Sequence, residues 1–124
     1  MISYYTIFTI LLFHWIFDFH LQTDEMAKGK SKCNAALLKH VGVYGWATIL
    51  ITLCNYRYFN NVGVAFAYPF INNVAHFLTD WITSRASSAL YKEERYHDFF
   101  VVIGADQMIH YITLFGTFVW LSNL

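Results

Sequence analysis

The sequence is poor in charge, in proline and in cysteine. Only 13% of its 124 residues are Asp, Glu, Lys or Arg, about half the share that is usual in soluble domains. Eight basic residues balance eight acidic ones, so no excess of positive charge marks a nucleic-acid-binding surface. The cysteines, Cys33 and Cys54, belong to no CxxC motif and are too few for a disulfide-stapled mini-protein. With 57% hydrophobic residues, the chain is not disordered either.

Four long apolar runs take the place of the missing charge. Each has about 20 residues or slightly more, which is enough to cross a hydrocarbon layer about 30 Å thick. The first run is not a signal peptide, because no basic segment precedes it and no small-x-small cleavage site follows. We therefore predict an all-α fold in one domain, a bundle of four transmembrane helices, with a soluble four-helix bundle as the alternative. The expected helices cover about residues 2–21, 35–55, 62–84 and 99–121.

The basic residues predict an orientation for this bundle. Cytoplasmic loops carry an excess of Lys and Arg, and here the first and third loops are the basic ones while the second has only Arg57. Both chain ends are then expected outside, with Cys33 and Cys54 near opposite faces of the membrane. The basic residues of the first and third loops are Lys28, Lys30, Lys32, Arg85, Lys92 and Arg95.

Seven of the His and Asp side chains inside the apolar runs form a candidate cluster, and every run contributes at least one. A charge at membrane depth costs at least ~2.5 kcal/mol on insertion scales, so such residues predict a functional site. Six of the seven form His and Asp pairs four residues apart, which places both members of a pair on one helical face. The seven are His14, Asp18, His40, His76, Asp80, Asp106 and His110.

The order within the pairs predicts how they meet. The first and third runs read HisxxxAsp and the fourth reads AspxxxHis, but the predicted topology turns the fourth helix the other way. The three Asp are therefore expected in one layer near the cytoplasm and the paired His one turn deeper, with His40 joining from the second helix. Amides at helical spacing are expected to orient these groups. They are Gln22, Asn72, Asn73 and Gln107.

Imidazoles and carboxylates in this number predict a metal centre. Three carboxylates carry three negative charges, which two divalent ions and one bridging hydroxide would neutralise in a low-dielectric interior. We expect one or two divalent transition-metal ions, Zn, Mn or Fe, because mixed nitrogen and oxygen ligation suits these metals better than Ca or Mg. The alternative is a metal-free web of His and Asp hydrogen bonds that joins helices or relays protons.

Basic residues at the expected cytoplasmic end have two interpretations. Lys28, Lys30 and Lys32 are typical of the positive-inside rule, although they also suit anionic lipid headgroups or nucleotides. Lys39 precedes His40, and Arg85 follows Asp80 by five residues. These two are the predicted contacts to a phosphate group.

Four motifs resemble a known protein family. They are HxxxDFxLQTDxMAxxK at 14–30, LLKH ending at His40, NxxxHxxxD at 72–80 and DQxxH at 106–110. Together they are similar to the small bacterial and phage membrane proteins called domain of unknown function 3307. The resemblance implies a helical, multi-pass protein of the bacterial inner (cytoplasmic) membrane, encoded by a bacterium or a phage. It also implies a loose similarity to proteins called membrane-bound metal-dependent hydrolases.

The function predicted from these features is metal-dependent hydrolysis of phosphoesters, such as lipid headgroups or nucleotides, at the cytoplasmic leaflet. A metal-bound hydroxide would be the nucleophile, because no separate general base is evident. The alternative is that one of the Asp residues takes the proton of the attacking water. Transport of a metal ion or a proton is the alternative, and a non-enzymatic accessory protein with a structural metal is a third. The expected partners are the bilayer, the substrate and, in a homo-oligomer, further copies of the chain, with no nucleic-acid duplex.

Overall fold

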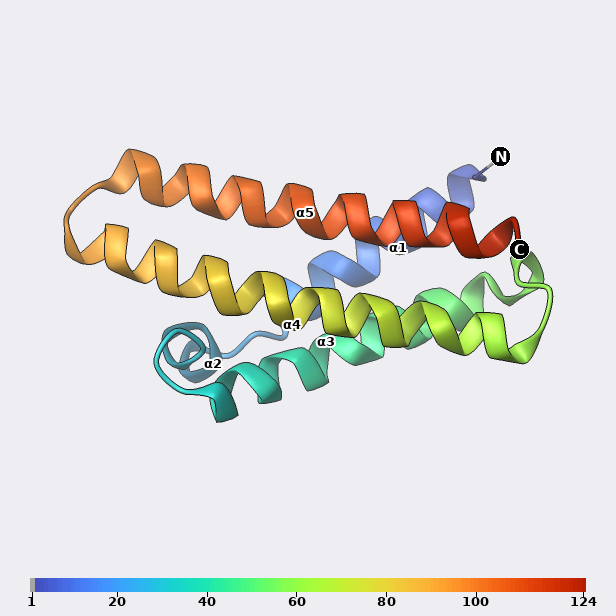
Figure 1. Cartoon of the computed structure of the whole chain (residues 1–124), viewed down its shortest axis with the longest axis horizontal. Helices are drawn as coiled ribbons and strands as arrows, with labels where there is room; N and C mark the ends of the chain where they lie inside the picture. Colours follow the sequence, from blue (N-terminus) through green and yellow to red (C-terminus); the bar gives the residue numbers. More distant parts are fainter. Residues whose placement is uncertain (1) are drawn as a thin grey trace.

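The computed structural model describes residues 2–124, and these are almost entirely helical with no strand among them. Four long segments form a bundle, and a short helix lies in the connection between the first two (Figure 1). In chain order the elements are α1 Tyr4–Trp15, the π-helix η1 Ile16–His20, α2 Asp24–Gly29, α3 Asn34–Cys54, the 3-10 helix η2 Tyr56–Tyr58, α4 Val62–Lys92 and α5 Tyr96–Ser122.

Each long helix packs mainly against the next one in the order α1, α3, α4, α5. α1 lies against α3, α3 against α4, and α4 along the length of α5, while α1 has few backbone contacts with α5. In Figure 1, α4 and α5 run antiparallel, and both chain ends lie at the same end of the bundle. α2 and the α4–α5 turn lie at the opposite end. We call these two ends the terminal end and the lysine end.

Polar caps fix where three of the helices begin. The side chains of Ser3, Thr23 and Asn61 accept hydrogen bonds from backbone amides in the first turns of α1, α2 and α4. These amides have no partner within their own helix, so a capping oxygen stabilises the helix start. Asn61 lies just before the third apolar run and Ser3 at the beginning of the first, which is why these two run boundaries locate helix starts well.

Three of the predicted helix boundaries need correction. The run at 2–21 is not one α-helix, because the backbone widens to a π-helix after Trp15, where the Leu21 amide donates to the Ile16 carbonyl. The third helix continues past 84 to Lys92, and the fourth begins at Tyr96 rather than 99. The segment 85–92 has no glycine or proline and contains good helix formers, so the end of the apolar run does not end the helix.

The terminal end contains the apolar core. Side chains from α1, α3, α4 and α5 meet there, and most are fully shielded from solvent. A small polar network joins α1 to the end of α3: Asn55 accepts a hydrogen bond from Thr6 and donates to Thr9. The core residues are Ile10, Ile51, Phe59, Ala65, Tyr68, Leu114, Phe118 and Leu121.

The middle of the bundle has the opposite composition. The seven His and Asp residues named above are all buried there, whereas large apolar side chains such as Phe66, Phe70 and Phe100 are about 70% exposed on the outside. Two helices, α3 and α5, are long and apolar enough to cross a membrane. An apolar exterior around a polar interior is the reverse of the usual arrangement in soluble proteins.

Candidate metal centre

The four long segments bring six of the seven predicted residues into two overlapping ligand groups. Asp18 comes from η1, His40 from α3, His76 and Asp80 from α4, and Asp106 and His110 from α5. One group consists of Asp18, His40, His76 and Asp80, and the other of Asp18, Asp106 and His110.

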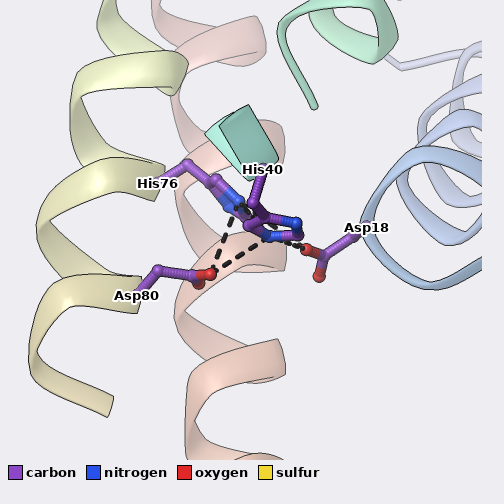
Figure 2. Close-up of side chains that lie close together, drawn as sticks. All are labelled: Asp18, His40, His76 and Asp80. Carbon is purple, nitrogen blue, oxygen red and sulfur yellow. Dashed lines mark hydrogen bonds and ion pairs between the residues drawn. The ribbon is translucent and has the colours of Figure 1, made fainter. Parts of the chain in front are cut away.

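The first group has the geometry of a four-ligand metal site. Figure 2 shows the His40 and His76 rings between the carboxylates of Asp18 and Asp80. His40 Nε2 lies 3.1 Å from His76 Nε2, from Asp18 Oδ1 and from Asp80 Oδ2. His76 Nε2 lies 3.6 Å and 3.8 Å from the same two oxygens. Ligands about 2.0–2.1 Å from a tetrahedral metal ion are separated by about 3.3 Å, close to these distances.

Hydrogen bonds alone do not explain these short distances, because the side chains carry too few hydrogens. Each Nε2 carries at most one hydrogen when its imidazole is neutral, and a carboxylate carries none. His40 Nε2 nevertheless faces three acceptors at 3.1 Å, and one hydrogen cannot bond well to all three. A divalent ion bound by all four atoms would satisfy them together, so the donor set fits a metal.

The second group shares Asp18 with the first and has three members, of which Asp18 and Asp106 line a hollow. His110 Nε2 lies 3.3 Å from Asp106 Oδ2 and 3.1 Å from Asp80 Oδ1. Asp80 therefore faces both groups, with Oδ2 toward His40 and Oδ1 toward His110. Carboxylates that present one oxygen to each of two sites are suited to bridge two metal ions.

A contact between two imidazoles couples the groups. His76 Nδ1 and His110 Nδ1 lie 3.4 Å apart, so one of them carries the hydrogen that the other accepts. If His76 donates, its Nε2 is free to bind a metal, and the Nε2 of neutral His110 then carries a hydrogen directed at Asp80 and Asp106. In neutral tautomers, only one of these two Nε2 atoms is available as a ligand at a time.

His14 and Gln107 form a bridge beside the ligand groups. His14 Nε2 and Gln107 Oε1 are 2.9 Å apart, and Gln107 Nε2 donates to Asp18 Oδ2 at 3.2 Å and to Asp106 Oδ2 at 3.0 Å. His14 itself is 3.7 Å from Asp18 and belongs to neither group. These side chains link α1 and η1 to α5, where the backbones are not in close contact.

The other predicted amides lie farther from the ligands. Asn72 donates to the Tyr68 carbonyl and to Thr117 on α5, and Asn73 donates to the Pro69 carbonyl and to Thr48 on α3. Both therefore join helices. The Oε1 atom of Gln22 is buried with no hydrogen-bond partner, and its side chain lines a hollow beside Asp18.

The two predicted phosphate contacts lie away from the ligand groups. Lys39 is exposed on α3. The Arg85 guanidinium donates to the Trp81 carbonyl and to Asn34 Oδ1, and it stacks over the Trp81 ring. Arg85 also lines a hollow near Lys32 and Lys92. Contact of either residue with phosphate stays a prediction.

The structure adds three residues to the site. Lys30 Nζ donates to Asp80 Oδ2 at 2.8 Å, Thr83 donates to Asp106 Oδ1 at 2.5 Å, and the Tyr44 ring stacks on His76 with 3.7 Å between ring centres. Helical spacing signals two of them, since Tyr44 follows His40 by four residues and Thr83 follows Asp80 by three. No such signal identifies Lys30, because its approach to Asp80 depends on how α2 folds back against α3.

A hollow of about 250 Å³ reaches the ligand groups from the lysine end. Asp18, Asp106 and Gln107 line its inner part. It connects the buried centre to the end of the bundle where the basic residues of the first loop lie. A buried metal centre with such an access route differs from a closed structural site.

These features define a class: an all-helical protein with an apolar exterior and a buried His and Asp centre suited to a metal ion. The chain belongs to the family described as protein of unknown function DUF3307, whose family model matches residues 6–123. That match confirms the resemblance that the four motifs indicate. No curated protein and no solved structure matches the chain.

Proposed function

We propose that this protein is a four-helix membrane protein with a metal ion at its centre. Its two apolar helices support the membrane location, and only 17% of the most apolar stretch of α5 is buried within the protein. The apolar faces of α4 and α5 need a nonpolar environment, which a bilayer supplies. The lysine end would face the cytoplasm, in keeping with the positive-inside rule, and the bacterial inner membrane is the proposed location.

One divalent ion in the first ligand group suits the charges of the centre. Asp18, Asp80 and Asp106 bring three negative charges, and the Lys30 ammonium at Asp80 neutralises one of them. A single divalent ion would balance the rest in the low-dielectric interior. A second ion would need the Nε2 of His110, which the contact with His76 opposes. We therefore favour one Zn, Mn or Fe ion, with the two-metal centre as the alternative.

The proposed reaction is hydrolysis of a phosphoester that enters from the lysine end. The observation that carries this proposal is the hollow that reaches Asp18 and Asp106 beside the convergent ligands. A metal ion there would activate water and neutralise the phosphate oxygens. Asp106, held by Thr83 and next to His110, is placed to accept a proton from the attacking water.

The apolar core argues against the transport alternative. A transported ion needs polar groups along its whole path, yet the described residues at the terminal end form a close-packed core that contains the fully buried Ile10, Ile51 and Leu114. The structural-metal alternative requires no access route, so the hollow favours the enzyme over it as well.

The test measures metal content and activity in the same preparation. Purified full-length protein should contain one equivalent of a transition metal and hydrolyse a chromogenic phosphomonoester or phosphodiester in detergent. Chelator should abolish turnover, as should His110→Ala, whereas His97→Ala, which changes an exposed histidine of α5, should have no effect. Protein that holds a metal but hydrolyses none of these esters would favour the structural-metal alternative, and protein without metal would refute the proposal.

A further inference from the structure

The access hollow continues into a larger one with strongly basic walls. The second hollow is about 460 Å³ and shares Ala27, Lys30, Ser84, Ser87 and Phe99 with the first. No acidic residue lines it. Four lysines line it, Lys28, Lys30, Lys32 and Lys92, although the Lys28 ammonium lies 3.9 Å from Asp24 and that of Lys30 is bound to Asp80. The positive potential of these groups would attract an anionic ligand towards the metal centre.

Unpartnered polar atoms lie where the two hollows meet. Ser84 is only 7% exposed, and its Oγ has no hydrogen-bond partner. Gln22 Oε1, in the wall of the inner hollow, is likewise buried and unpaired. Buried polar atoms in native proteins are nearly always paired, so an unpaired hydroxyl that lines a hollow points to a ligand. Because a serine hydroxyl both donates and accepts, Ser84 suits a phosphate oxygen.

Lys30 connects the ligand groups to this site. Its side chain is 19% exposed and lines both hollows, while its ammonium is bound to Asp80 Oδ2. The same Asp80 oxygen faces His40 Nε2. The Lys30 ammonium carries three hydrogens, so it can stay bound to Asp80 while it donates to an anion in the hollow.

The inner hollow has an apolar wall and a polar one. Phe19 of η1 and Phe99, Val102 and Ile103 of α5 form the apolar wall, and the same two elements also contribute Asp18, Asp106 and Gln107 to the hollow. Lys30, which follows α2, and Ser84 and Ser87 of α4 form the polar wall. The apolar wall belongs to the two elements whose backbones are not closely packed together, η1 and α5. A ligand with a charged head and a hydrocarbon tail matches both walls, whereas a nucleotide has no apolar tail to place against these side chains.

We propose that the joined hollows bind an anionic lipid through its phosphate headgroup, with Lys30 and Ser84 as headgroup contacts and the acyl chain against Phe19 and Phe99. This inference rests on the proposed function, because it makes that lipid the phosphoester presented to the metal centre. It selects a lipid over a soluble phosphate ester as the substrate class.

Three matched probes test the lipid site on full-length protein in detergent. Dihexanoyl phosphatidic acid has the phosphate and the tails, glycerol 3-phosphate has the same head without tails, and dihexanoyl phosphatidylcholine has the tails without net charge. Binding is measured by native mass spectrometry. The phosphatidic acid should bind at least tenfold more tightly than either other probe. Equal binding of glycerol 3-phosphate would indicate a soluble ester, and equal binding of phosphatidylcholine would indicate unspecific lipid adsorption; either result overturns the proposal.

Variants then locate the site. Lys30→Met should weaken binding of the phosphatidic acid at least tenfold, and Arg57→Met, which removes an equal charge at the far end of the bundle, should not. Ser84→Ala leaves the Lys30–Asp80 ion pair in place and should weaken binding several-fold, so it decides the matter if Lys30→Met does not fold. Unchanged binding in Ser84→Ala would overturn the assignment of the site.

Metal content, measured on the same samples, separates the two proposals. Lipid-selective binding by protein without metal would refute the metal centre and support the lipid site. A loaded metal centre without lipid selectivity would refute only the lipid site.

Discussion

The terminal end of the bundle pairs its buried polar groups more completely than the centre and the lysine end do. At the terminal end, Asn55 satisfies both Thr6 and Thr9, and these three residues leave no buried side-chain atom unpaired. From the centre to the lysine end, buried atoms of His14, His40, Gln22 and Ser84 have no partner, and on the terminal side of the centre the same holds for the side-chain oxygens of Asn72 and Asn73. Both regions are built from the same helices, so the difference does not come from the fold class.

This contrast indicates which region is shaped for stability and which for a ligand. Unpaired buried polar atoms cost free energy, and a chain retains them where something else binds. At the terminal end, the buried groups of Thr6, Thr9 and Asn55 pair with one another beside the apolar core. The centre combines convergent ligand atoms, unpaired polar atoms and an access route, and the proposed cation and anion would complete it.

The largest effect on the metal centre is expected from Asp80→Asn, which should lower metal affinity by at least about tenfold. The substitution removes the carboxylate that faces His40, His110 and Lys30 together. Metal analysis after dialysis measures the effect. Asp98→Asn is the control, because Asp98 pairs only with Arg95 in the turn before α5. Equal metal content in Asp80→Asn and in the unaltered protein would remove Asp80 from the ligands.

Leu114→Ala should act on the other half alone. Leu114 is fully buried in the apolar core, and truncation of such a side chain costs about 2–4 kcal/mol of unfolding free energy through the cavity that it leaves. Metal stoichiometry should stay unchanged. Ile112→Ala, two residues away and 64% exposed, should change stability little. Loss of metal in Leu114→Ala would show that the two regions are not independent.

A smaller effect is expected from Thr83→Val. The substitution keeps the shape of the side chain but removes the hydrogen bond to Asp106, so we expect a loss of about 1 kcal/mol in stability. Activity should fall while the metal stays bound, because Asp106 lies outside the first ligand group. Thr113→Val is the control, since that hydroxyl donates only to backbone carbonyls. Equal activity of the Thr83→Val and Thr113→Val variants would exclude a role in catalysis for the Thr83–Asp106 contact.

Labelling of the native cysteines should distinguish the two ends without any change in stability. Cys33 precedes α3 near the lysine end, and Cys54 ends the same helix; both are exposed and unpaired. In inside-out vesicles, an impermeant maleimide should label Cys54→Ser protein, through Cys33, and not Cys33→Ser protein. The reverse pattern would place the lysine end, and with it the access hollow, outside the cell.

Local periodicity explains how much of the site the sequence predicts. His76 and Asp80, like Asp106 and His110, share a helical face whatever the tertiary packing, because four residues make about one helical turn. Apolar runs likewise locate the long helices, and polar residues such as Asn61 locate their starts. Helix ends are less visible, as α4 shows, because a helix need not stop where its apolar run does.

Tertiary structure alone decided how the helical faces that carry His and Asp come together. The π-helix that carries Asp18, the approach of Lys30 to Asp80 and the division into two ligand groups depend on how η1, α2 and α5 lie against one another, and no spacing along the chain encodes such distances. Asn72 and Asn73 illustrate the same limit: they share a helical spacing with His76, yet they bond to Thr117 and Thr48 on the neighbouring helices. The sequence by itself determined the long helices and the chemistry on their faces. Packing determined which side chains meet at the candidate metal centre and which residues line the hollow that reaches it, because those are contacts between residues far apart in the chain.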